Sequence, residues 1–524
     1  MLKVFQSEIL DPGKFIVTLE LVPGRYSSGK SMDTVKAIAC DSFADGRIAA
    51  VSVTDNPGGN PSLSPDVLGR DIFQVGMDVI LHFASRDLNR VGMESRALQL
   101  AMMGMKNILA VTGDYTGKGF GGQGAPVFDL ESVSSLMLLR YLSRRLLDAG
   151  DPDGFFAGCA VSPFKRTEAE CFAQYAKLAR KIAAGAQFII TQLGYDARKF
   201  AEVMHLLRQR GWQLPIMGSV YMLTPKAATI MNRGLIPGAV VTDKLLAEIR
   251  TEWETPAQGR RLAIERAAKL GAVLKGLGYR GMHIGGVHSG FDTVGKILDR
   301  MREIEGDWQD FYCEFDYPQQ DGFYVFPRYI QGGNPSEQFG RAAYDLPLNE
   351  RMHYSFLKTV HDRFFSFTSP LAPVCGRASR WIDEHKKVEK LASCLENTSK
   401  RALLDCQHCG DCGIQHVGFL CPESQCPKHT RNGQCGGSRD GQCEVYPNKP
   451  CVWVRAHGRL AFYKATDTMA SACVPPRRWE LNKTNSWLNF HLKRDHQGVP
   501  FQQDAPVTPT SDCGGTETDL HQKK

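Results

Sequence analysis

Cysteine is the residue type whose spacing points most directly to chemistry. Eight of the 16 cysteines lie between Cys406 and Cys451, and in a chain without a secretion signal such clustering indicates metal binding rather than disulfides. Cys406, Cys409 and Cys412 are separated by two residues each, and Cys421 precedes a proline, which is close to ferredoxin-like ligation of a [4Fe–4S] cluster. Four thiolates also hold tetrahedral zinc, so both metals stay open. The predicted ligands are Cys406, Cys409, Cys412, Cys421, Cys426, Cys435, Cys443 and Cys451.

Polar residues at the ends of short apolar runs form a second set of candidates. They are Glu20, Thr54, His82, Thr112, Asp114, Thr191 and Gln192. In α/β barrels the active site lies at the C-terminal ends of the strands, so each of these side chains could face it. A carboxylate inside the segment TLEL is costly to bury unless it is paired or functional. Desolvation would raise the pKa of Glu20 and suit it to general acid catalysis, whereas the structural alternative is a buried basic partner.

The other polar positions also have structural alternatives. Asp114 follows a glycine, which permits close approach of the backbone to a ligand, but an aspartate there could instead cap a helix. His82 could be an ordinary core histidine. Gln192 offers a donor and an acceptor for the edge of a pterin-like ring, or it fills a layer of the barrel. Lys181 lies in a helical stretch, where a lysine is ordinarily a solvated charge.

These residues need a scaffold, and from residue 14 to about 290 the chain repeats one unit. Each unit is an apolar run followed by an amphipathic helical stretch, such as residues 132–147 or 168–184. The runs are continuously apolar, as expected for strands buried on both faces of a parallel sheet. Eight units predict a (β/α)₈ TIM barrel, because the rival open sheet lacks its GxGxxG fingerprint. The runs cover residues 15–21, 48–54, 78–83, 107–114, 155–161, 187–193, 215–220 and 282–287.

Composition narrows the classes of function. The 524 residues are 43% hydrophobic and 23% charged, which is ordinary globular composition. The formal net charge is only +7, and without a long basic run we expect no nucleic-acid partner. No apolar stretch reaches the ~18 residues of a membrane span. The first residues, MLKVFQSE, carry an early acid and no apolar core, so we expect no signal peptide and a cytoplasmic protein.

Several strand ends carry a family resemblance. The segments TLELVPG, SVTDNP, HFASRDLN, NILAVTGD, VFDLESV and GAQFIITQLGYD, in this order across residues 14–290, resemble methylenetetrahydrofolate reductase. The resemblance implies a flavin-dependent barrel that passes hydride from a donor to flavin and then to 5,10-methylenetetrahydrofolate. It places the catalytic acid on Glu20, an aspartate near flavin and pterin on Asp114, and the folate-binding amide on Gln192. The flavin contacts that it implies are Thr54, His82, Thr112, Asp114, Phe128 and Lys181.

Some positions depart from the family pattern. Thr112 stands where an arginine commonly precedes Gly-Asp, and Gln174 and Lys177 stand at positions that contact flavin in simpler members. The resemblance therefore implies FAD with FMN as the alternative, and leaves NAD(P)H or a protein as the electron donor.

The cysteine-rich block carries a second resemblance. The segment NGQCGGSRDGQCEVYPNKPCVWVRAHGRL, within residues 395–465, resembles the small partner subunit of anaerobic-type methylenetetrahydrofolate reductases. Because that subunit is implicated in iron–sulfur or zinc binding, the resemblance favours iron–sulfur here and suggests an electron path from a donor protein to the flavin.

Together these observations predict four segments and one main function. The segments are a barrel over 1–295, a connecting mixed or helical region over 296–400, a Cys-rich metal-binding domain over 401–496 and a disordered tail over 497–524. The predicted activity is reduction of 5,10-methylenetetrahydrofolate to 5-methyltetrahydrofolate, or the reverse. The alternative is a folate-linked one-carbon transferase or demethylation component with structural zinc and no redox step. We expect a folate substrate, an electron-donor protein as a candidate partner, and a homo-oligomer.

Overall fold

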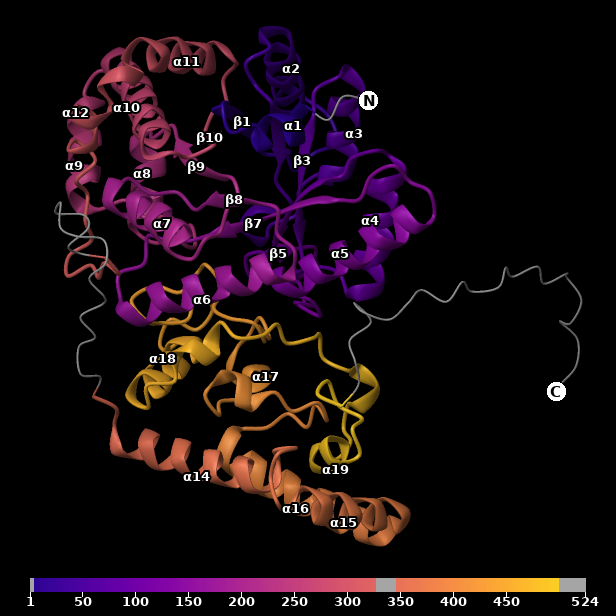
Figure 1. The fold of residues 1–524 in the computed structure, drawn as a ribbon. Helices are drawn as coiled ribbons and strands as arrows, with labels where there is room; N and C mark the ends of the chain where they lie inside the picture. The colour runs from indigo at the N-terminus through magenta and orange to yellow at the C-terminus, as the bar shows by residue number, and fades with distance from the viewer. Residues whose placement is uncertain (1–3, 327–344, 499–524) are drawn as a thin grey trace, which may run out of the picture.

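The predicted barrel is present. The computed structural model describes residues 4–326 and 345–498, and its N-terminal part is a closed barrel of eight parallel strands ringed by helices (Figure 1). Neighbouring strands follow the chain order, with β1 pairing with β10 to close the circle. The strands are β1 (Ile16–Leu21), β2 (Ala50–Val53), β3 (Val79–Ala84), β4 (Asn107–Val111), β7 (Phe156–Val161), β8 (Phe188–Thr191), β9 (Ile216–Tyr221) and β10 (Gly281–Gly285).

Side-chain alternation along β1 explains why a carboxylate can lie inside an apolar run. Leu19 and Leu21 pack in the core between strands and helices, whereas Ile16 belongs to the cluster inside the barrel. Because successive residues of a strand face opposite sides, Thr18 and Glu20 also face the barrel axis. The run is therefore apolar on its outer face and becomes polar only on its inner face towards the C-terminal end.

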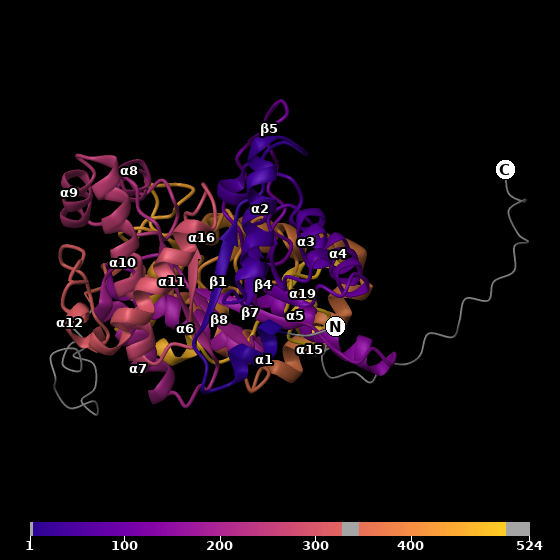
Figure 2. The same ribbon diagram turned by 90° about the horizontal axis from the view of Figure 1, so that it is seen from above.

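Helices cover the outside of the barrel, and every barrel strand is followed by at least one helix before the next barrel strand. The helices of this part are α2 (Lys30–Asp45), α3 (Pro65–Val75), α4 (Arg90–Met102), α5 (Ser132–Asp148), α6 (Glu168–Ala184), α7 (Ala197–Gln209), α8 (Pro225–Asn232), α9 (Asp243–Glu252), α10 (Pro256–Leu277), α11 (Asp292–Ile304) and α12 (Trp308–Tyr312). A small hairpin, β5 (Lys118–Gly119) and β6 (Gly122–Gln123), projects from the body between β4 and α5 (Figure 2).

The N-terminal end of the barrel is closed by α1 (Val4–Leu10), which the sequence analysis did not anticipate. Phe5 and Ile9 are fully buried, and the Phe5 ring meets Phe156 and Phe188 edge to face with centroids 5.9 and 5.2 Å away. The Phe5 amide donates to the Asp78 carboxylate at 3.1 Å. With this end filled by apolar side chains, the C-terminal end is left for a ligand.

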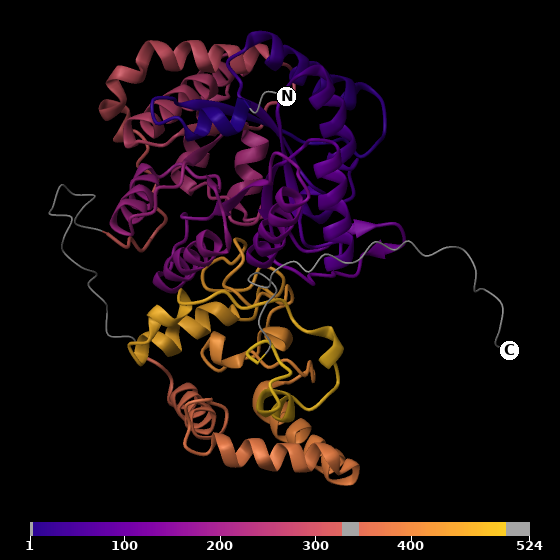
Figure 3. The ribbon, with the colours of Figure 1, turned by 45° about the vertical axis from the view of Figure 1, so that its right-hand side comes forward.

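The C-terminal part lies against one side of the barrel, with α6 between the barrel strands and the Cys-rich segment (Figures 1 and 3). Its described residues form helices and loops. The predicted segment boundary at 295 falls inside α11, and the boundary at 400 falls inside α16 (Lys386–Leu404), so the division into these segments stays a prediction. The predicted tail, apart from residues 497 and 498, lies outside the described residues. The helices are α14 (Leu348–Phe364), α15 (Ala372–Glu384), α16 (Lys386–Leu404), α17 (Pro422–Gln425), α18 (Val452–Phe462) and α19 (Ser486–His491).

Short 3₁₀ helices complete the described structure, and none of its helices combines the length and apolarity needed to cross a membrane. The 3₁₀ helices are η1 (Pro57–Gly59), η2 (Glu305–Asp307), η3 (Ile414–Val417), η4 (Thr466–Met469) and η5 (Trp479–Leu481).

Candidate functional site

The predicted site residues of the barrel converge on one cavity of about 310 Å³ at the C-terminal ends of the strands. Seven of the eight predicted catalytic, folate-binding and flavin-binding positions line it: Glu20, Thr54, His82, Thr112, Asp114, Lys181 and Gln192. Phe128 lines a different cavity instead.

Glu20 is partly buried, with 27% of its side chain exposed, and it has no compensating ion pair. Burial raises its pKa from 4.5 to about 7. Its nearest basic group is His283, whose Nε2 lies 3.9 Å from the Glu20 carboxylate. Burial, reinforced by His82, lowers the pKa of His283 to about 3, so the imidazole is neutral and does not stabilise a carboxylate. Glu20 is therefore a carboxyl group that still holds its proton near neutral pH.

His283 is a site residue that the sequence analysis missed. Thr18 Oγ1 lies 2.7 Å from His283 Nδ1, and Ser52 Oγ lies 3.3 Å from Nε2. These hydroxyls fix the ring beneath Glu20. The signal was available, because His283 interrupts the last apolar run just as His82 interrupts the third.

Asp114 lies in the turn after β4 and is not the N-cap of the next helix. The N-cap of that helix, α5, is Glu131. Asp114 is therefore not the cap of this helix, which was the structural alternative. The Asp114 carboxylate accepts a hydrogen bond from the Gly58 amide at 3.0 Å. Gly113 has φ +86°, and a Cβ there would lie 3.3 Å from Ala84 Cβ, so this turn favours glycine.

Apart from the Glu444 carboxylate, which is ion-paired with Lys428, three buried polar atoms at the cavity have no hydrogen-bond partner among the described residues. They are Thr54 Oγ1, His82 Nε2 and Ser162 Oγ. Burial, together with the charge of Arg96, lowers the pKa of His82 to about 4, so this ring is neutral. Buried polar atoms are ordinarily satisfied, and three unsatisfied ones around one cavity are typical of a ligand site.

Lys181 and Gln192 line the cavity with their polar ends bonded to backbone. Lys181 Nζ donates to the Ala160 carbonyl at 2.6 Å, and burial lowers its pKa to about 8; it is thus not the solvated helix charge of the structural alternative. Gln192 Nε2 donates to the Pro237 carbonyl at 3.1 Å, and its Oε1 accepts from the Leu193 amide.

Phe128 and Thr112 have local structural roles. Phe128 is 3% exposed with φ +39° and stacks on Tyr115 at a centroid distance of 6.1 Å. Thr112 Oγ1 lies 3.3 Å from the hydroxyl of Ser132, the first residue of α5. The structure thus separates Phe128 from the other predicted flavin contacts.

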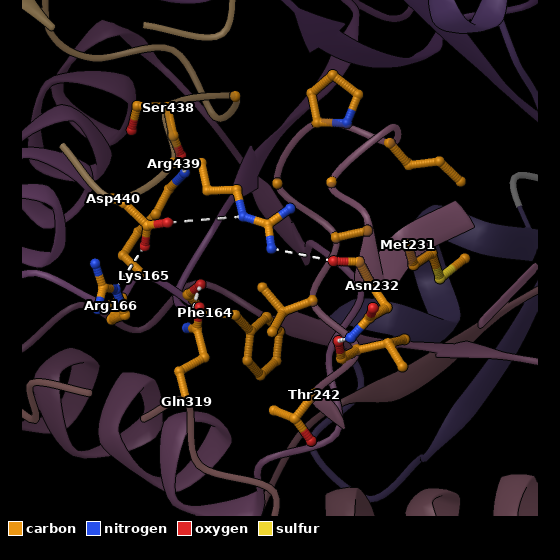
Figure 4. Close-up of a pocket in the computed structure, with 18 of the residues that line it drawn as sticks. Phe164, Lys165, Arg166, Met231, Asn232, Thr242, Gln319, Ser438, Arg439 and Asp440 are labelled. Carbon is orange, nitrogen blue, oxygen red and sulfur yellow. Dashed lines mark hydrogen bonds and ion pairs between the residues drawn. The ribbon is translucent and has the colours of Figure 1, made fainter. Parts of the chain in front are cut away.

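The Cys-rich segment forms one wall of the barrel cavity, which sequence reasoning did not foresee. The residues that it contributes are Lys428, Gln434, Cys435, Gly436, Gly437 and Glu444. A second cavity of about 270 Å³ shares Pro237 and Gly437 with the first, and Arg439 extends into it between Asn232 and Asp440 (Figure 4). The mouth of the barrel is therefore bounded by two parts of the chain.

Comparison with known proteins agrees with this arrangement. The methylenetetrahydrofolate reductase family matches residues 6–299, which is more than half of the chain. The chain belongs to the methylenetetrahydrofolate reductase family. A second family, described as the C-terminal region of methylene-tetrahydrofolate reductase, matches residues 385–480.

Individual relatives of this reductase-family chain are distant. A probable methylenetetrahydrofolate reductase (NADPH) of Caenorhabditis elegans is 24% identical over 221 residues, which are 40% of this chain and 31% of the relative; the chain thus spans about a third of that protein. An uncharacterized Clostridium thermocellum protein that binds two copies of 5-methyl-5,6,7,8-tetrahydrofolic acid is 13% identical, with a TM-score of 0.40 over 58% of this chain and 99% of that one. An oxaloacetate acetylhydrolase is 11% identical, with a TM-score of 0.32 over 59% and 88%. The two structural likenesses are too weak to bear on function.

Two positions that depart from the reductase-family pattern contact the Cys-rich segment. Gln174 Nε2 donates to the Cys435 carbonyl at 2.9 Å, and Lys177 Nζ donates to the Gly433 carbonyl at 3.3 Å while pairing with Glu131 at 2.8 Å. Gly433 has φ +127°, and a Cβ there would lie 2.8 Å from Lys177 Cβ. Both side chains also line the barrel cavity, so this part of α6 meets the Cys-rich segment at the cavity wall.

The eight clustered cysteines of this family member separate into two groups of four. Cys406, Cys409, Cys412 and Cys421 line one recess. The thiols of Cys426, Cys435, Cys443 and Cys451 lie close enough to raise one another's pKa. All cysteines in the described residues are free thiols, and no three of their sulfur atoms lie within 4.8 Å of one another.

Proposed function

We propose that the protein reduces 5,10-methylenetetrahydrofolate to 5-methyltetrahydrofolate, or runs the reverse reaction, on a flavin bound in the barrel cavity. The observation that carries the proposal is Glu20, a half-buried carboxyl group with a pKa of about 7 at the mouth of a barrel of this family. A group that is half protonated at neutral pH is suited to donate a proton there.

The reaction needs a proton donor and two electrons. Opening the five-membered ring of the substrate leaves a negative charge on a ring nitrogen, and the proton of Glu20 neutralises it. His283, neutral and 3.9 Å away, does not take that proton from Glu20. Asp114 and Gln192 lie on the same cavity and would orient the pterin ring through its donors and acceptors.

A flavin fits the polar groups that the cavity leaves unsatisfied. Thr54 Oγ1, His82 Nε2 and Ser162 Oγ offer hydrogen-bonding atoms to such a ring system, and Lys181 lies in the same wall. When bound, the reduced flavin supplies the hydride that goes to the methylene carbon. The barrel residues named above would hold the flavin, and the Cys-rich segment forms the wall that bounds the cavity on its own side.

The contacts of α6 favour FMN over FAD. An adenylyl arm needs polar partners beyond the flavin ring. Gln174 and Lys177, at positions that contact flavin in simpler members, line the cavity but have their polar ends bonded to Cys435 and Gly433. Phe128, another predicted contact, is buried against Tyr115. These observations support a mononucleotide in this chain.

We infer iron–sulfur clusters rather than zinc at the two cysteine groups, because the two-residue spacing of Cys406, Cys409 and Cys412 and the proline after Cys421 follow ferredoxin-like ligation. Cys435 belongs to one group and also lines the barrel cavity, which supports electron supply through the Cys-rich domain, from NAD(P)H or a donor protein.

The deciding experiment is an absorbance spectrum of anaerobically purified protein, with flavin, iron, sulfide and zinc assayed on the same sample. We expect FMN on release of the flavin, about eight irons per chain for two cubanes, and folate reduction with at least one of several donors. Zinc without flavin would refute the reductase proposal and support the folate-linked transferase that the sequence left as an alternative.

A further inference from the structure

Lys428, a buried cation that the Cys-rich domain inserts into the wall of the barrel cavity, has no role in the function described so far. We propose that Lys428 is a positioning residue of the active site, which holds the Gly113–Asp114 turn and sets the charge of the cavity, so that the barrel is catalytically complete only with the Cys-rich domain docked. This inference rests on the proposed function, because the flavin and folate of that proposal occupy the same cavity.

The contacts of Lys428 join the two parts of the chain at the site. Its side chain is 4% exposed. Nζ donates to the Gly113 carbonyl at 2.8 Å, across 315 residues of sequence, and forms an ion pair with Glu444. Nζ also lies 5.9 Å from the centroid of the Phe128 ring. Lys428, Gly113 and Glu444 all line the cavity.

The charge of Lys428 is stabilised from both sides of the interface. The Glu444 carboxylate pairs with Nζ from the Cys-rich segment, and the Gly113 carbonyl of the barrel accepts a hydrogen bond from the same atom. A lysine with both partners keeps its charge although it is buried.

Stability alone does not explain this ion pair. The desolvation free energy of a buried lysine and glutamate is about as large as the free energy of their attraction. Apolar replacements of such a pair are therefore often neutral or stabilising. The pair also lies at a cavity wall rather than in the core of either domain. A cation fixed beside Asp114 does have a functional consequence, because a flavin in this cavity gains negative charge on reduction and a nearby cation favours that form.

The test compares four variants of the full-length holoprotein. Lys428→Met removes the cation, Lys428→Arg keeps it, and Lys428→Met with Glu444→Leu removes the pair without leaving a buried unpaired charge. The matched control is Asp440→Asn, which removes an ion pair between Asp440 and Arg166 across the same interface but outside the barrel cavity. The measurements are flavin and iron content, the midpoint potential of the flavin and the rate of folate reduction.

We expect the midpoint potential to become more negative in Lys428→Met, which removes the cation alone, and folate reduction to fall by at least about tenfold in both variants that lack the lysine, as for loss of one charged hydrogen-bond partner. Lys428→Arg should restore both values towards wild type, and Asp440→Asn should leave them unchanged. An unchanged potential in Lys428→Met, or a wild-type rate of folate reduction in the double variant, each with flavin bound, overturns the inference and leaves the reductase proposal intact. Failure of the arginine to restore the potential also overturns it. A wild-type protein without flavin overturns both.

Discussion

Replacing Glu20 with glutamine tests the proposed acid most directly. Glutamine has nearly the same shape but cannot donate a proton from a carboxyl group. Because burial is the sole cause of the raised pKa of Glu20, the substitution breaks no ion pair, and the cavity should keep its form. The loss should therefore be confined to the step that needs the proton.

The magnitude follows from the pKa. With a pKa of about 7, half of the Glu20 carboxyls are protonated at pH 7 and about one tenth at pH 8. Wild-type folate reduction should therefore fall about tenfold per pH unit above neutrality. Loss of a general acid lowers a rate by about 100- to 10,000-fold, and Glu20→Gln should show this loss at pH 7 together with a flat profile above it.

Separate half-reactions in a stopped-flow instrument provide the assay. Reduction of the flavin by the donor serves as the internal control, because it requires no proton from Glu20, and it should be unchanged in Glu20→Gln. Glu20→Asp is the matched variant, since it keeps the carboxyl group but draws it back by one methylene, and its folate half-reaction should retain the pH dependence at a lower rate. A glutamine variant that reduces folate at a wild-type rate with a wild-type pH profile would refute the assignment of Glu20 as the acid.

Three further predictions concern stability and metal content. The folded-state pKa of Glu20 lies above its ordinary value, so the contribution of its protonated form to stability is complete below pH 4.5 and is lost as pH rises through about 7. At pH 8, Glu20→Gln should therefore have a higher free energy of unfolding than wild type, by at most about 3 kcal/mol, measured by urea denaturation. Equal stability at pH 8 would contradict this. Gly113→Ala should destabilise the fold by about 1–2 kcal/mol, seen as a lower melting temperature, because φ is +86° and Ala84 is close. Cys412→Ser and Cys435→Ser should each remove about half of the iron, whereas loss of all iron from either variant would indicate one shared centre.

The barrel and most of its site could be predicted because the signals are local. Each strand is buried on both faces, so each run is continuously apolar, and a polar residue at its end is conspicuous. Glu20, His82 and Asp114 were found in this way and all line the cavity. His283 carries the same signal inside the last run. The position of Phe128 came from the family resemblance, and its packing against Tyr115 depends on a turn with positive φ that no local pattern indicates.

The wall supplied by the Cys-rich domain could not be predicted. Lys428 and Glu444 lie among cysteines, where a charged residue is ordinarily a solvated loop position. Their place at the barrel depends on contacts with residues such as Gly113, far away in the sequence. Gln174 and Lys177 did stand out as departures from the family pattern, and the structure gives the reason: their partners are backbone atoms of the Cys-rich segment.

The chemistry of this interface indicates that the two parts stay together. Buried side chains of the barrel donate to backbone carbonyls of the Cys-rich segment: Lys165 bonds to Gly436 at 2.7 Å, and Gln174 bonds to Cys435 at 2.9 Å. Undocking would leave buried donors and carbonyls that need new partners, which costs free energy at each one. A domain that swings during turnover would need an interface that releases cheaply. Cys435 is therefore held at the cavity wall by the fold, and a metal centre at the second cysteine group would stay beside a flavin bound in this cavity.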